Sequence, residues 1–192
     1  MVKRLAVFAS GNGTNFTALW QAIQDRQLPA QIVLLVCDHA DAPVVQRAAV
    51  AGVPVFCIDF KAYENKANAE AAILTRLQAA QVTTILLAGY MRLIGPTLLD
   101  AYPQHIINLH PALLPHFPGR HSIEDALAAG ATTTGVTIHF VDAGIDTGQI
   151  IAQRAVAILP TDTYETLAPR IHAVEHQLYP DTLQELIKQH CI

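Results

Sequence analysis

The sequence has little charge, little cysteine and no long apolar run. Charged residues make up 15% of the 192 residues and hydrophobic residues 52%, which excludes a disordered chain and a solvated coiled coil. The three cysteines are odd in number and widely spaced, without a C-x-x-C pair, so we expect a reducing compartment. No apolar run approaches the ~18 residues of a membrane span, and the first apolar run is too short for a signal peptide. We therefore expect a cytoplasmic protein.

Positive charge is also scarce. The chain has 12 Lys and Arg against 16 Asp and Glu, which gives a net charge of −4. A nucleic-acid surface needs clustered cations that displace phosphate counterions, so we expect no nucleic-acid partner, and no membrane partner either. At the usual ~150 residues per domain the length suits one domain, and no repeat, low-complexity segment or linker divides it. We expect a single domain over residues 1–192.

In the first half, short apolar runs alternate with longer helical patterns. Runs that are apolar on both faces and separated by helices are typical of a parallel sheet covered on both sides. The pattern therefore predicts an α/β fold with a doubly wound, mostly parallel, Rossmann-like sheet and helices on both faces. The predicted strands are 5–9, 31–37, 53–58 and 83–88, and the predicted helices are 14–26, 43–51 and 62–80.

The second half is less regular, and its prolines predict a stiff loop and a broken helix. Three prolines between residues 111 and 118 lack a backbone donor and restrict their neighbours. The segment 162–188 is largely helical in pattern, and Pro169 and Pro180 are expected to interrupt or bound its pieces. The other predicted elements are strands over 106–109, 133–141 and 149–158 and a helix over 123–129 that Ser122 caps.

A glycine-containing loop, Ser-Gly-Asn-Gly-Thr-Asn at residues 10–15, joins the first predicted strand to the first predicted helix. Free N–H groups at such a helix start form an anion site. The dinucleotide pattern G-x-G-x-x-G fails because Phe16 stands where close packing needs glycine, and there is no Gly-Lys-Ser/Thr ending. The loop therefore favours a small phosphate monoester. A tight turn capped by Thr14 or Asn15 is the alternative.

Asn108 and His110 follow a predicted strand end, where parallel sheets present their chemistry. Residues two apart in an extended chain share a face, so the two side chains point the same way. An amide donor beside an imidazole suits an acyl carbon that becomes tetrahedral. Asp146, in a glycine-flanked loop, is the candidate carboxylate that would raise the pKa of His110 toward the protonated form. A histidine of the core or of a turn is the alternative interpretation.

The segment His172-Ala-Val-Glu175-His176 matches H-x-x-E-H, a zinc-protease pattern with both histidines on one helical face. That chemistry needs a third ligand downstream, where Glu185 is the main carboxylate candidate. No other signal points to a metal, so we expect none. Solvent-facing helix residues are the simpler interpretation of the two histidines.

Four segments, residues 10–15, 87–94, 107–115 and 135–151, occur in an order that matches a known family. Together they closely resemble the phosphoribosylglycinamide formyltransferases, a folate-dependent formyltransferase family, over nearly the whole chain. The resemblance implies transfer of the formyl group of 10-formyltetrahydrofolate, as cosubstrate, to the amine of 5'-phosphoribosylglycinamide in purine biosynthesis. It implies small-molecule partners and no metal, and it leaves a homodimer open.

The resemblance also assigns residues to three sites. Protonated His110 and Asn108 would stabilise the tetrahedral oxygen, and Asp146 would support the imidazolium. Residues 1–100 would form the phosphate- and nucleotide-binding half and residues 101–192 the folate-binding and catalytic half. The ribonucleotide site comprises Gly13, Thr14, Asn15, His172, Ala173, Val174 and Glu175. The folate site comprises Lys66, Met91, Arg92, Leu93, Ile94, Asn108, Asp142, Ala143, Gly144, Ile145 and Asp146. Many members have an arginine where this chain has Lys66, which keeps the charge but loses the planar fork.

Three rival functions remain open. A formyltetrahydrofolate hydrolase would use the same trio with water in place of the amine, and such proteins usually carry an additional amino-terminal domain. Methionyl-tRNA formyltransferase shares the central motif and adds a basic carboxy-terminal domain that holds RNA. Because the first predicted strand begins by Leu5 and the chain is acidic, we favour neither. A non-catalytic phosphometabolite-binding module on the same fold is the third.

Overall fold

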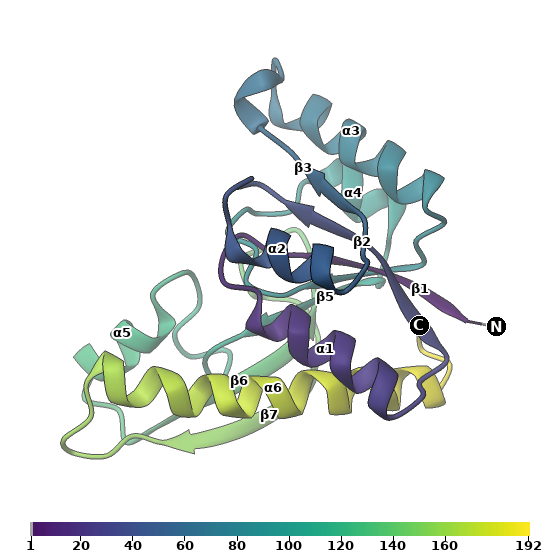
Figure 1. The fold of residues 1–192 in the computed structure, drawn as a ribbon. Helices are drawn as coiled ribbons and strands as arrows, with labels where there is room; N and C mark the ends of the chain where they lie inside the picture. Colours follow the sequence, from purple (N-terminus) through teal and green to yellow (C-terminus); the bar gives the residue numbers. More distant parts are fainter. Residues whose placement is uncertain (1) are drawn as a thin grey trace.

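The computed structural model describes residues 2–192, and its centre is one seven-stranded sheet with the order β3-β2-β1-β4-β5-β6-β7 (Figure 1). The elements in chain order are β1 (Lys3–Phe8), α1 (Thr14–Asp25), β2 (Ala30–Cys37), α2 (Pro43–Val50), β3 (Val55–Cys57), the 3-10 turn η1 (Phe60–Ala62), α3 (Lys66–Ala79), β4 (Thr84–Leu87), α4 (Pro96–Ala101), β5 (Ile106–His110), α5 (Ser122–Ala128), β6 (Thr133–Phe140), β7 (Ile150–Ala157) and α6 (Tyr164–Lys188).

Strands β1 to β5 pair in parallel, and β6 and β7 extend the sheet in antiparallel pairing. Strand β1 lies between β2 and β4, so the chain winds outward from β1 in both directions. This arrangement confirms the predicted doubly wound, mostly parallel sheet. The carboxyl ends of β1, β4 and β5 lie next to one another at one end of the strands. Open α/β sheets bind their ligands at this end.

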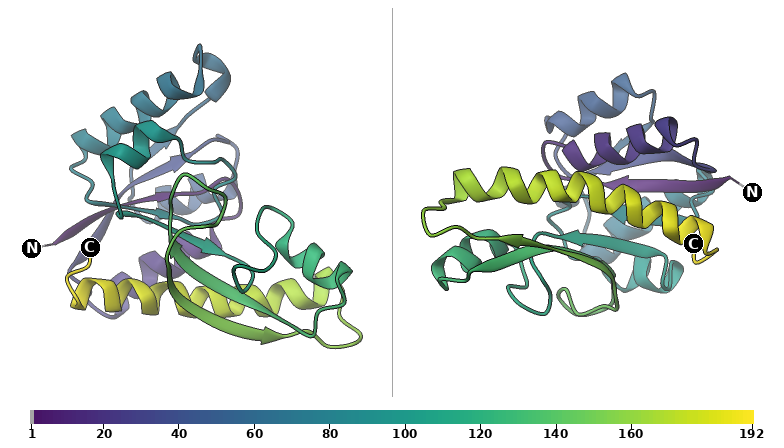
Figure 2. Two further views of the ribbon diagram at one scale, coloured as in Figure 1. Left: turned by 180° about the vertical axis from the view of Figure 1, so that it is seen from behind. Right: turned by 90° about the horizontal axis from the view of Figure 1, so that it is seen from below.

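The two faces of the sheet support two separate apolar cores, because successive side chains of a strand point to opposite faces. On β1, Leu5 and Val7 pack into one core, whereas Ala6 and Phe8 pack into the other. The first core also contains side chains of α1, α2, α5 and α6, and the second contains side chains of α3 and α4. Helices therefore cover both faces, as predicted (Figures 1 and 2).

Helix α6 is one continuous helix of 25 residues that contains both Pro169 and Pro180. The prediction that these prolines interrupt or bound separate pieces is therefore wrong (Figure 2). A proline inside a helix costs about 3 kcal/mol because it lacks a donor and crowds the preceding turn. Burial of one large apolar side chain contributes ~1.5–3 kcal/mol, and α6 buries a whole row of them. That row includes Leu167, Ile171, Leu178, Tyr179, Leu183, Leu186 and Ile187.

Two local features also differ from the sequence-based expectation. The pattern does not predict α4, a short helix with a proline in its first turn. Ser122, expected to cap the following helix, is instead the first residue of α5, and His121 occupies the N-cap position. The Ser122 hydroxyl donates to the Pro111 carbonyl oxygen over 3.4 Å. The serine therefore joins α5 to the proline-rich loop rather than capping the helix.

The two ends of the described chain lie beside each other, near the amino-terminal ends of the parallel strands. All views in Figures 1 and 2 place them together, at the end of the molecule where α6 finishes. Ile192 is buried there. The loops at residues 10–15 and 91–94 lie at the opposite end of the parallel strands, after β1 and β4, whereas the loop at residues 142–146 follows β6, which is antiparallel to β5.

The hydroxyl of Tyr179 hydrogen-bonds α6 to the sheet, and its removal should destabilise the fold. It lies 3.2 Å from the Leu87 carbonyl oxygen and 3.0 Å from the Ile107 carbonyl oxygen, in a fully buried position. Loss of a buried hydrogen bond costs about 1–3 kcal/mol, so Tyr179→Phe should lower the free energy of unfolding by that amount in urea denaturation. Tyr102→Phe is the control, because that hydroxyl makes one longer contact, 3.4 Å to the Val82 carbonyl. Equal effects of the two changes would contradict the prediction.

Candidate active site

Asn108 and His110 project from β5 toward the carboxylate of Asp146, which lies in the loop between β6 and β7. The Asn108 Nδ2 atom lies 3.5 Å from Asp146 Oδ1, and the His110 Nδ1 atom lies 3.5 Å from Asp146 Oδ2. Because residues two apart on a strand share a face, one carboxylate spans both side chains. The structure thus brings together the three residues that the sequence nominated as catalytic.

His110 is held in a buried position with a defined tautomer. Its Nε2 atom lies 2.8 Å from the Phe117 carbonyl oxygen, and a carbonyl can only accept, so Nε2 carries the proton. Burial lowers the pKa of His110 below its ordinary value, although the Phe117 carbonyl and the charge of Asp146 act in the opposite direction. Asp146 thus raises the pKa of His110 as expected, but desolvation of the ring outweighs it, so the net direction is opposite to the expected one.

Asp146 keeps its negative charge although it is largely buried. Its Oδ2 atom accepts the Gly119 N–H at 2.8 Å. Burial alone would raise the pKa of Asp146, but the neighbouring His139, the Gly119 N–H and the charge that His110 can carry outweigh burial and lower it. The residue has a φ of 55°, a left-handed conformation that Asp and Asn tolerate better than most residues.

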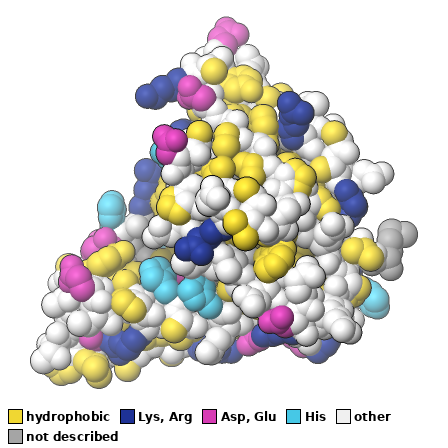
Figure 3. All heavy atoms as spheres, in the orientation of Figure 1, with side chains coloured by type: hydrophobic (Ala, Val, Ile, Leu, Met, Phe, Trp, Pro, Cys, Tyr) yellow, Lys and Arg dark blue, Asp and Glu magenta, His cyan; other side chains and the backbone are white. Residues whose placement is uncertain are grey.

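His139 is a site residue that the sequence reasoning missed. It lies directly opposite Asn108 in the antiparallel pairing of β5 with β6. Its Nδ1–H donates to the Phe140 carbonyl oxygen at 2.8 Å, and its Nε2 atom lies 3.1 Å from Asn108 Nδ2 and 3.6 Å from Asp146 Oδ1. The available signal was a histidine between the apolar residues Ile138 and Phe140 of the predicted strand 133–141. Figure 3 shows histidine side chains gathered to the lower left of the centre of this face of the molecule, whereas His139 itself is only 2% exposed.

The arrangement supplies one hydrogen-bond donor and one base around a common point. The Asn108 amide nitrogen lies next to His139 Nε2 and faces Asp146 over a long contact that a ligand oxygen can replace. The unprotonated Nδ1 of His110 can take a proton, and the Asp146 carboxylate would stabilise the imidazolium formed. This combination suits the formation and collapse of a tetrahedral carbon.

The glycine loop at residues 10–15 ends in an uncapped helix. Gly13 is the N-cap of α1, with a φ of 73°, and no side chain caps the helix start. A Cβ atom at Gly13 would lie 2.4 Å from Val44 Cγ2, so only glycine fits between the loop and α2. The N–H groups of the first turn, which includes Thr14, are thus available to an anion, in agreement with the phosphate interpretation.

A buried carboxylate from α6 lies beside this loop. Glu175 is 2% exposed, and its Oε2 atom accepts from Asn15 Nδ2 at 2.8 Å and contacts His172 Nδ1 at 3.0 Å. Hydrogen bonding to Glu175 raises the pKa of His172 despite partial burial. Residues 13–15 and 172–175 are therefore adjacent in space, with Ala173 exposed and Val174 packed against the core. The Asn15 side chain orients Glu175, which the sequence did not indicate.

The two segments expected to line a folate pocket carry exposed apolar side chains. Met91, Leu93 and Ile145 are 50%, 58% and 54% exposed, so both segments present apolar side chains to solvent. Ile94 packs against the second core. Arg120 Nη2 donates to the Met91 carbonyl at 2.6 Å, so the loop that contacts Asp146 also touches residues 91–94.

The remaining predicted site residues lie around these segments. Lys66 begins α3, and its Nζ atom lies 3.6 Å from Glu70 Oε1. That same oxygen accepts the Gly95 N–H at 2.6 Å, directly after residues 91–94. In the loop at residues 142–146, the Asp142 carboxylate accepts from Gly144 N–H and from the Thr147 hydroxyl, while Ala143 is exposed. Lys66 is thus connected to the predicted folate segment through Glu70.

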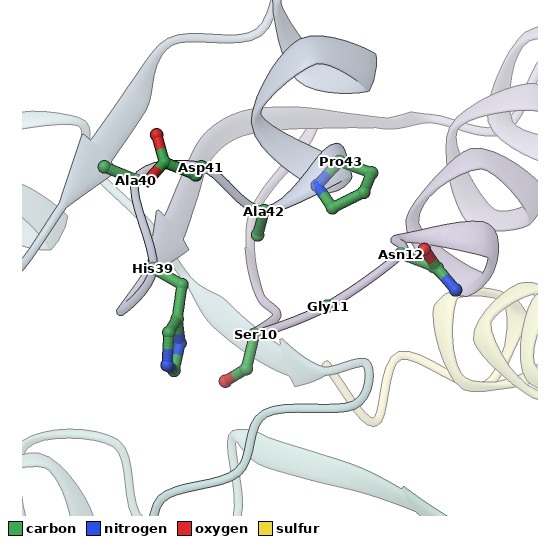
Figure 4. Close-up of a pocket in the computed structure, with 8 residues that line it drawn as sticks. All are labelled: Ser10, Gly11, Asn12, His39, Ala40, Asp41, Ala42 and Pro43. Carbon is green, nitrogen blue, oxygen red and sulfur yellow. The ribbon is translucent and has the colours of Figure 1, made fainter.

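An open cavity of about 510 Å³ lies on the other side of the glycine loop (Figure 4). Ser10, Gly11 and Asn12 form one wall, and residues 39–43 form the other. The catalytic trio does not line this cavity. Arg47 of α2 donates from Nε to the Asn12 carbonyl at 2.7 Å and so places a positive charge next to the loop.

Within residues 2–192 the structure contains no cluster of three or more His, Cys, Asp or Glu side chains arranged to hold a metal. His172 of the H-x-x-E-H pattern contacts Glu175, and the buried Nε2 of His176 has no hydrogen-bond partner. No helix in the described part of the chain is long and apolar enough to cross a membrane.

Comparison with known proteins gives consistent matches to formyl transferases. A family model described as formyl transferase matches residues 3–183. A phosphoribosylglycinamide formyltransferase of Bacillus subtilis is 49% identical over 186 residues, which cover 97% of this chain and 95% of that protein. The trifunctional purine biosynthetic protein adenosine-3 of Drosophila melanogaster is 40% identical over 187 residues, 96% of this chain but 14% of the longer protein.

Solved structures agree with these sequence matches. Glycinamide ribonucleotide transformylase 1 of Geobacillus kaustophilus superposes with a TM-score of 0.95 at 54% identity, covering 97% of this chain and all of that one, 100%. Phosphoribosylglycinamide formyltransferase of Bacillus halodurans superposes with a TM-score of 0.94 at 52% identity, covering 96% and 95%.

The two functional histidines should titrate on opposite sides of the ordinary histidine value. NMR titration of the ring protons should give His172 a raised pKa and His110 a lowered pKa, because Glu175 hydrogen-bonds the first and burial dominates the second. Asp146→Asn should lower the pKa of His110 further, since it removes the charge that favours the imidazolium. Glu175→Gln should return His172 toward its ordinary value. A His110 that titrates above the ordinary value would mean that the Asp146 charge outweighs burial, contrary to this prediction.

Proposed function

The chain belongs to the formyl transferase family, and we propose that it transfers the formyl group of 10-formyltetrahydrofolate to the amine of 5'-phosphoribosylglycinamide. The products are the N-formyl ribonucleotide and tetrahydrofolate, in purine biosynthesis. The observation that carries the proposal is that three features lie at neighbouring strands of the sheet: the uncapped, glycine-started helix after β1, the exposed apolar residues 91–94 after β4, and the Asn108–His110–Asp146 cluster at β5. The three free cysteines fit a cytoplasmic setting for this reaction.

The ribonucleotide site in this proposal is formed by the start of α1 and the middle of α6. The phosphate binds the N–H groups of the first turn at Gly13, Thr14 and Asn15, and protonated His172 adds a positive charge beside it. The buried carboxylate of Glu175 accepts hydrogen bonds from the glycinamide. The hydrogen bond from Asn15 fixes the orientation of this carboxylate. Both halves of the chain therefore contribute to this site.

The folate site in this proposal is formed by residues 91–94 and 142–146, together with Asn108. Met91, Leu93 and Ile145 offer exposed apolar surface to the flat rings of the cosubstrate. Polar groups of the loop at residues 142–146 fix the orientation, since that loop is stabilised by the Asp142 carboxylate. Lys66 supplies positive charge next to Glu70, at the far end of residues 91–94.

The reaction in this proposal uses a neutral His110, in line with the lowered pKa of that residue. The neutral glycinamide amine attacks the formyl carbon, a C–N bond forms, and the carbonyl electron pair moves to oxygen. The Asn108 amide hydrogen-bonds that oxygen. Nδ1 of neutral His110 takes the proton that the attacking nitrogen loses, and Asp146 stabilises the resulting imidazolium. The imidazolium then returns the proton to N10 of the folate as the bond between N10 and the formyl carbon breaks.

The rival functions differ in what they require of the ribonucleotide. A hydrolase would release formate from 10-formyltetrahydrofolate without it, and a binding module would not turn over at all. Glu175 is buried and is hydrogen-bonded to Asn15 of the glycine loop. This proximity of a carboxylate to the proposed phosphate site favours an acceptor that carries both a phosphate and an amine. The transferase is thus the function that uses all of the groups described.

Formyl transfer should depend on the ribonucleotide and on two residues of β5. We expect the purified protein to deformylate 10-formyltetrahydrofolate only when 5'-phosphoribosylglycinamide is present, as followed by absorbance of the folate and mass of the product. Asn108→Ala and His110→Ala should fold normally and lower kcat by ~10²–10³, because each removes a group that acts on the tetrahedral carbon.

The control is His105→Ala. His105 immediately precedes the first residue of β5, and its ring hydrogen-bonds the nearby Pro103 carbonyl oxygen. This variant should keep near-normal turnover. Deformylation without the ribonucleotide would favour the hydrolase. Absence of turnover under all conditions, with the phosphate ester still bound, would favour the binding module.

The pH dependence of kcat/KM should report the lowered pKa of His110. The neutral ring is the active form, so activity should fall as the pH drops through a pKa below the ordinary histidine value of about 6.5. Asp146→Asn should move this acid limb to still lower pH and lower the plateau by ~10²–10³, because the imidazolium loses its carboxylate. Asparagine keeps the left-handed backbone at this position. An acid limb above the ordinary histidine value would contradict the role of a neutral His110.

A further inference from the structure

Three polar side chains lie in one row across the last three strands of the sheet. His110 of β5 pairs with Thr137 of β6, and Thr137 pairs with Gln153 of β7. Directly opposite residues on neighbouring strands place their side chains on the same face of a sheet. Thr137 is completely buried, whereas Gln153 lies exposed on the edge strand. The proposed reaction uses His110 but gives the other two side chains no part.

The Thr137 hydroxyl uses its full hydrogen-bonding capacity on the proline-rich loop and on its neighbour in the row. It donates to the Ala112 carbonyl oxygen at 2.6 Å, accepts the Leu114 N–H at 3.1 Å and accepts from Gln153 Nε2 at 2.9 Å. A hydroxyl has one hydrogen to donate and two lone pairs, so all three are in use. Because a buried network with every group paired favours one arrangement, Thr137 fixes the backbone of residues 112–114.

Gln153 attaches the same segment to the edge strand. Its Nε2 atom donates to the Leu114 carbonyl oxygen at 2.9 Å, in addition to its bond to Thr137. A carbonyl oxygen can only accept, so the amide nitrogen faces the loop, and both of its hydrogens are in use. Leu114 is thus bonded through its N–H to a side chain of β6 and through its carbonyl to a side chain of β7.

The same loop then returns to the catalytic cluster. The Phe117 carbonyl oxygen lies 2.8 Å from His110 Nε2, and the Gly119 N–H donates to Asp146 Oδ2 at 2.8 Å. The Phe117 contact keeps the ring proton on Nε2, which leaves Nδ1 as the base that faces Asp146 at 3.5 Å. The position of residues 117–119 therefore decides both the tautomer of His110 and the place of its carboxylate.

We propose that Thr137 and Gln153 are positioning residues for the proposed base His110. They hold residues 112–114 against β6 and β7 and so fix the loop that follows, in which Phe117 accepts from His110 Nε2. Apolar burial also keeps the segment against the sheet, but apolar contacts have no direction, so the hydrogen bonds orient its backbone. The proposal rests on the proposed function, because it takes His110 as the base in formyl transfer.

Two variants remove these hydrogen bonds, and a third retains them. Thr137→Val keeps the shape of the side chain and removes its hydroxyl, whereas Thr137→Ser keeps the hydroxyl. Gln153→Ala removes the amide at an exposed position, so it alters the loop contact without opening the core. The matched control is Thr134→Val in the same strand. Thr134 is 1% exposed, and its hydroxyl oxygen has no hydrogen-bond partner among the described residues.

Nitrogen NMR of the His110 ring, without substrates, is the first measurement. Burial lowers the pKa of His110 and the Phe117 hydrogen bond raises it, so loss of that bond in Thr137→Val should lower the pKa further. The ring proton should also move in part from Nε2 to Nδ1. Gln153→Ala should shift both in the same direction by a smaller amount. None of the variants changes the titratable groups that act on this ring, which are Asp146, His139 and Glu175.

Turnover is the second measurement. Thr137→Val should lower kcat by ~10–100-fold, because a displacement of about 1 Å at a reacting group can cost ~10²-fold. KM for both substrates should change by less than about threefold, since no group of the proposed substrate sites is removed. Gln153→Ala keeps the Thr137 bonds to the loop and should lower kcat about three- to tenfold. Thr137→Ser and Thr134→Val should keep the wild-type tautomer and near-normal kcat.

The proposal is wrong if Thr137→Val lowers the melting temperature while the tautomer, the pKa of His110 and kcat stay as in the wild-type protein. Thr137 is then merely structural. Equal effects of Thr134→Val would also contradict it, because that change breaks no bond to the loop. Should Thr137→Val not fold, Gln153→Ala decides the question in the same way. Wild-type turnover, measured first, tests the proposed function separately, and the ring NMR needs no substrate.

Discussion

The burial of one face of α6 against the sheet is the interaction on which the rest of the molecule depends. This helix contacts α1, α5, β6 and β7, so it joins the parallel part of the sheet to the antiparallel part. Its Tyr179 hydrogen-bonds the carbonyls of Leu87, at the end of β4, and Ile107, near the start of β5, and one turn earlier Glu175 contacts Asn15 at the start of α1. The buried apolar side chains of α6 keep the helix continuous through its two prolines. They therefore also set the distance between the glycine loop and the strand that carries Asn108 and His110.

Competition between burial and neighbouring charge decides the protonation states at this edge of the sheet. His110 and His172 each face a carboxylate, yet their pKa values move in opposite directions. His110 is almost fully enclosed and its carboxylate is 3.5 Å away, whereas His172 is half exposed and lies 3.0 Å from Glu175. Desolvation dominates in the first case and hydrogen bonding in the second. One histidine is thereby available as a base and the other as a cation.

The strands and their mostly parallel pairing were largely predictable, because apolar runs bounded by turn residues, as in β2 and β4, indicate burial on both faces. The trio was predictable because Asn108 and His110 share a strand face. The continuity of α6 was not predictable from the sequence. The effect of a proline is judged from its neighbours along the chain, and these do not show how much apolar surface the helix buries against the sheet. The pKa of His110 was missed because a sequence shows a charged neighbour but not the depth of burial. His139 was missed because its role depends on strand register, which pairs it with Asn108 across thirty-one positions of sequence.

The position of the two chain ends has a consequence for how this fold can be combined with others. Both ends lie together where the parallel strands begin, and the loops that follow β1 and β4 lie at the opposite end of these strands. A segment joined at either end would therefore start away from the loops at residues 10–15 and 91–94. The Drosophila melanogaster relative, of which this chain spans only 14%, is much longer than this fold. The geometry explains how such a fold can serve as a module in a longer polypeptide without a redesign of its site.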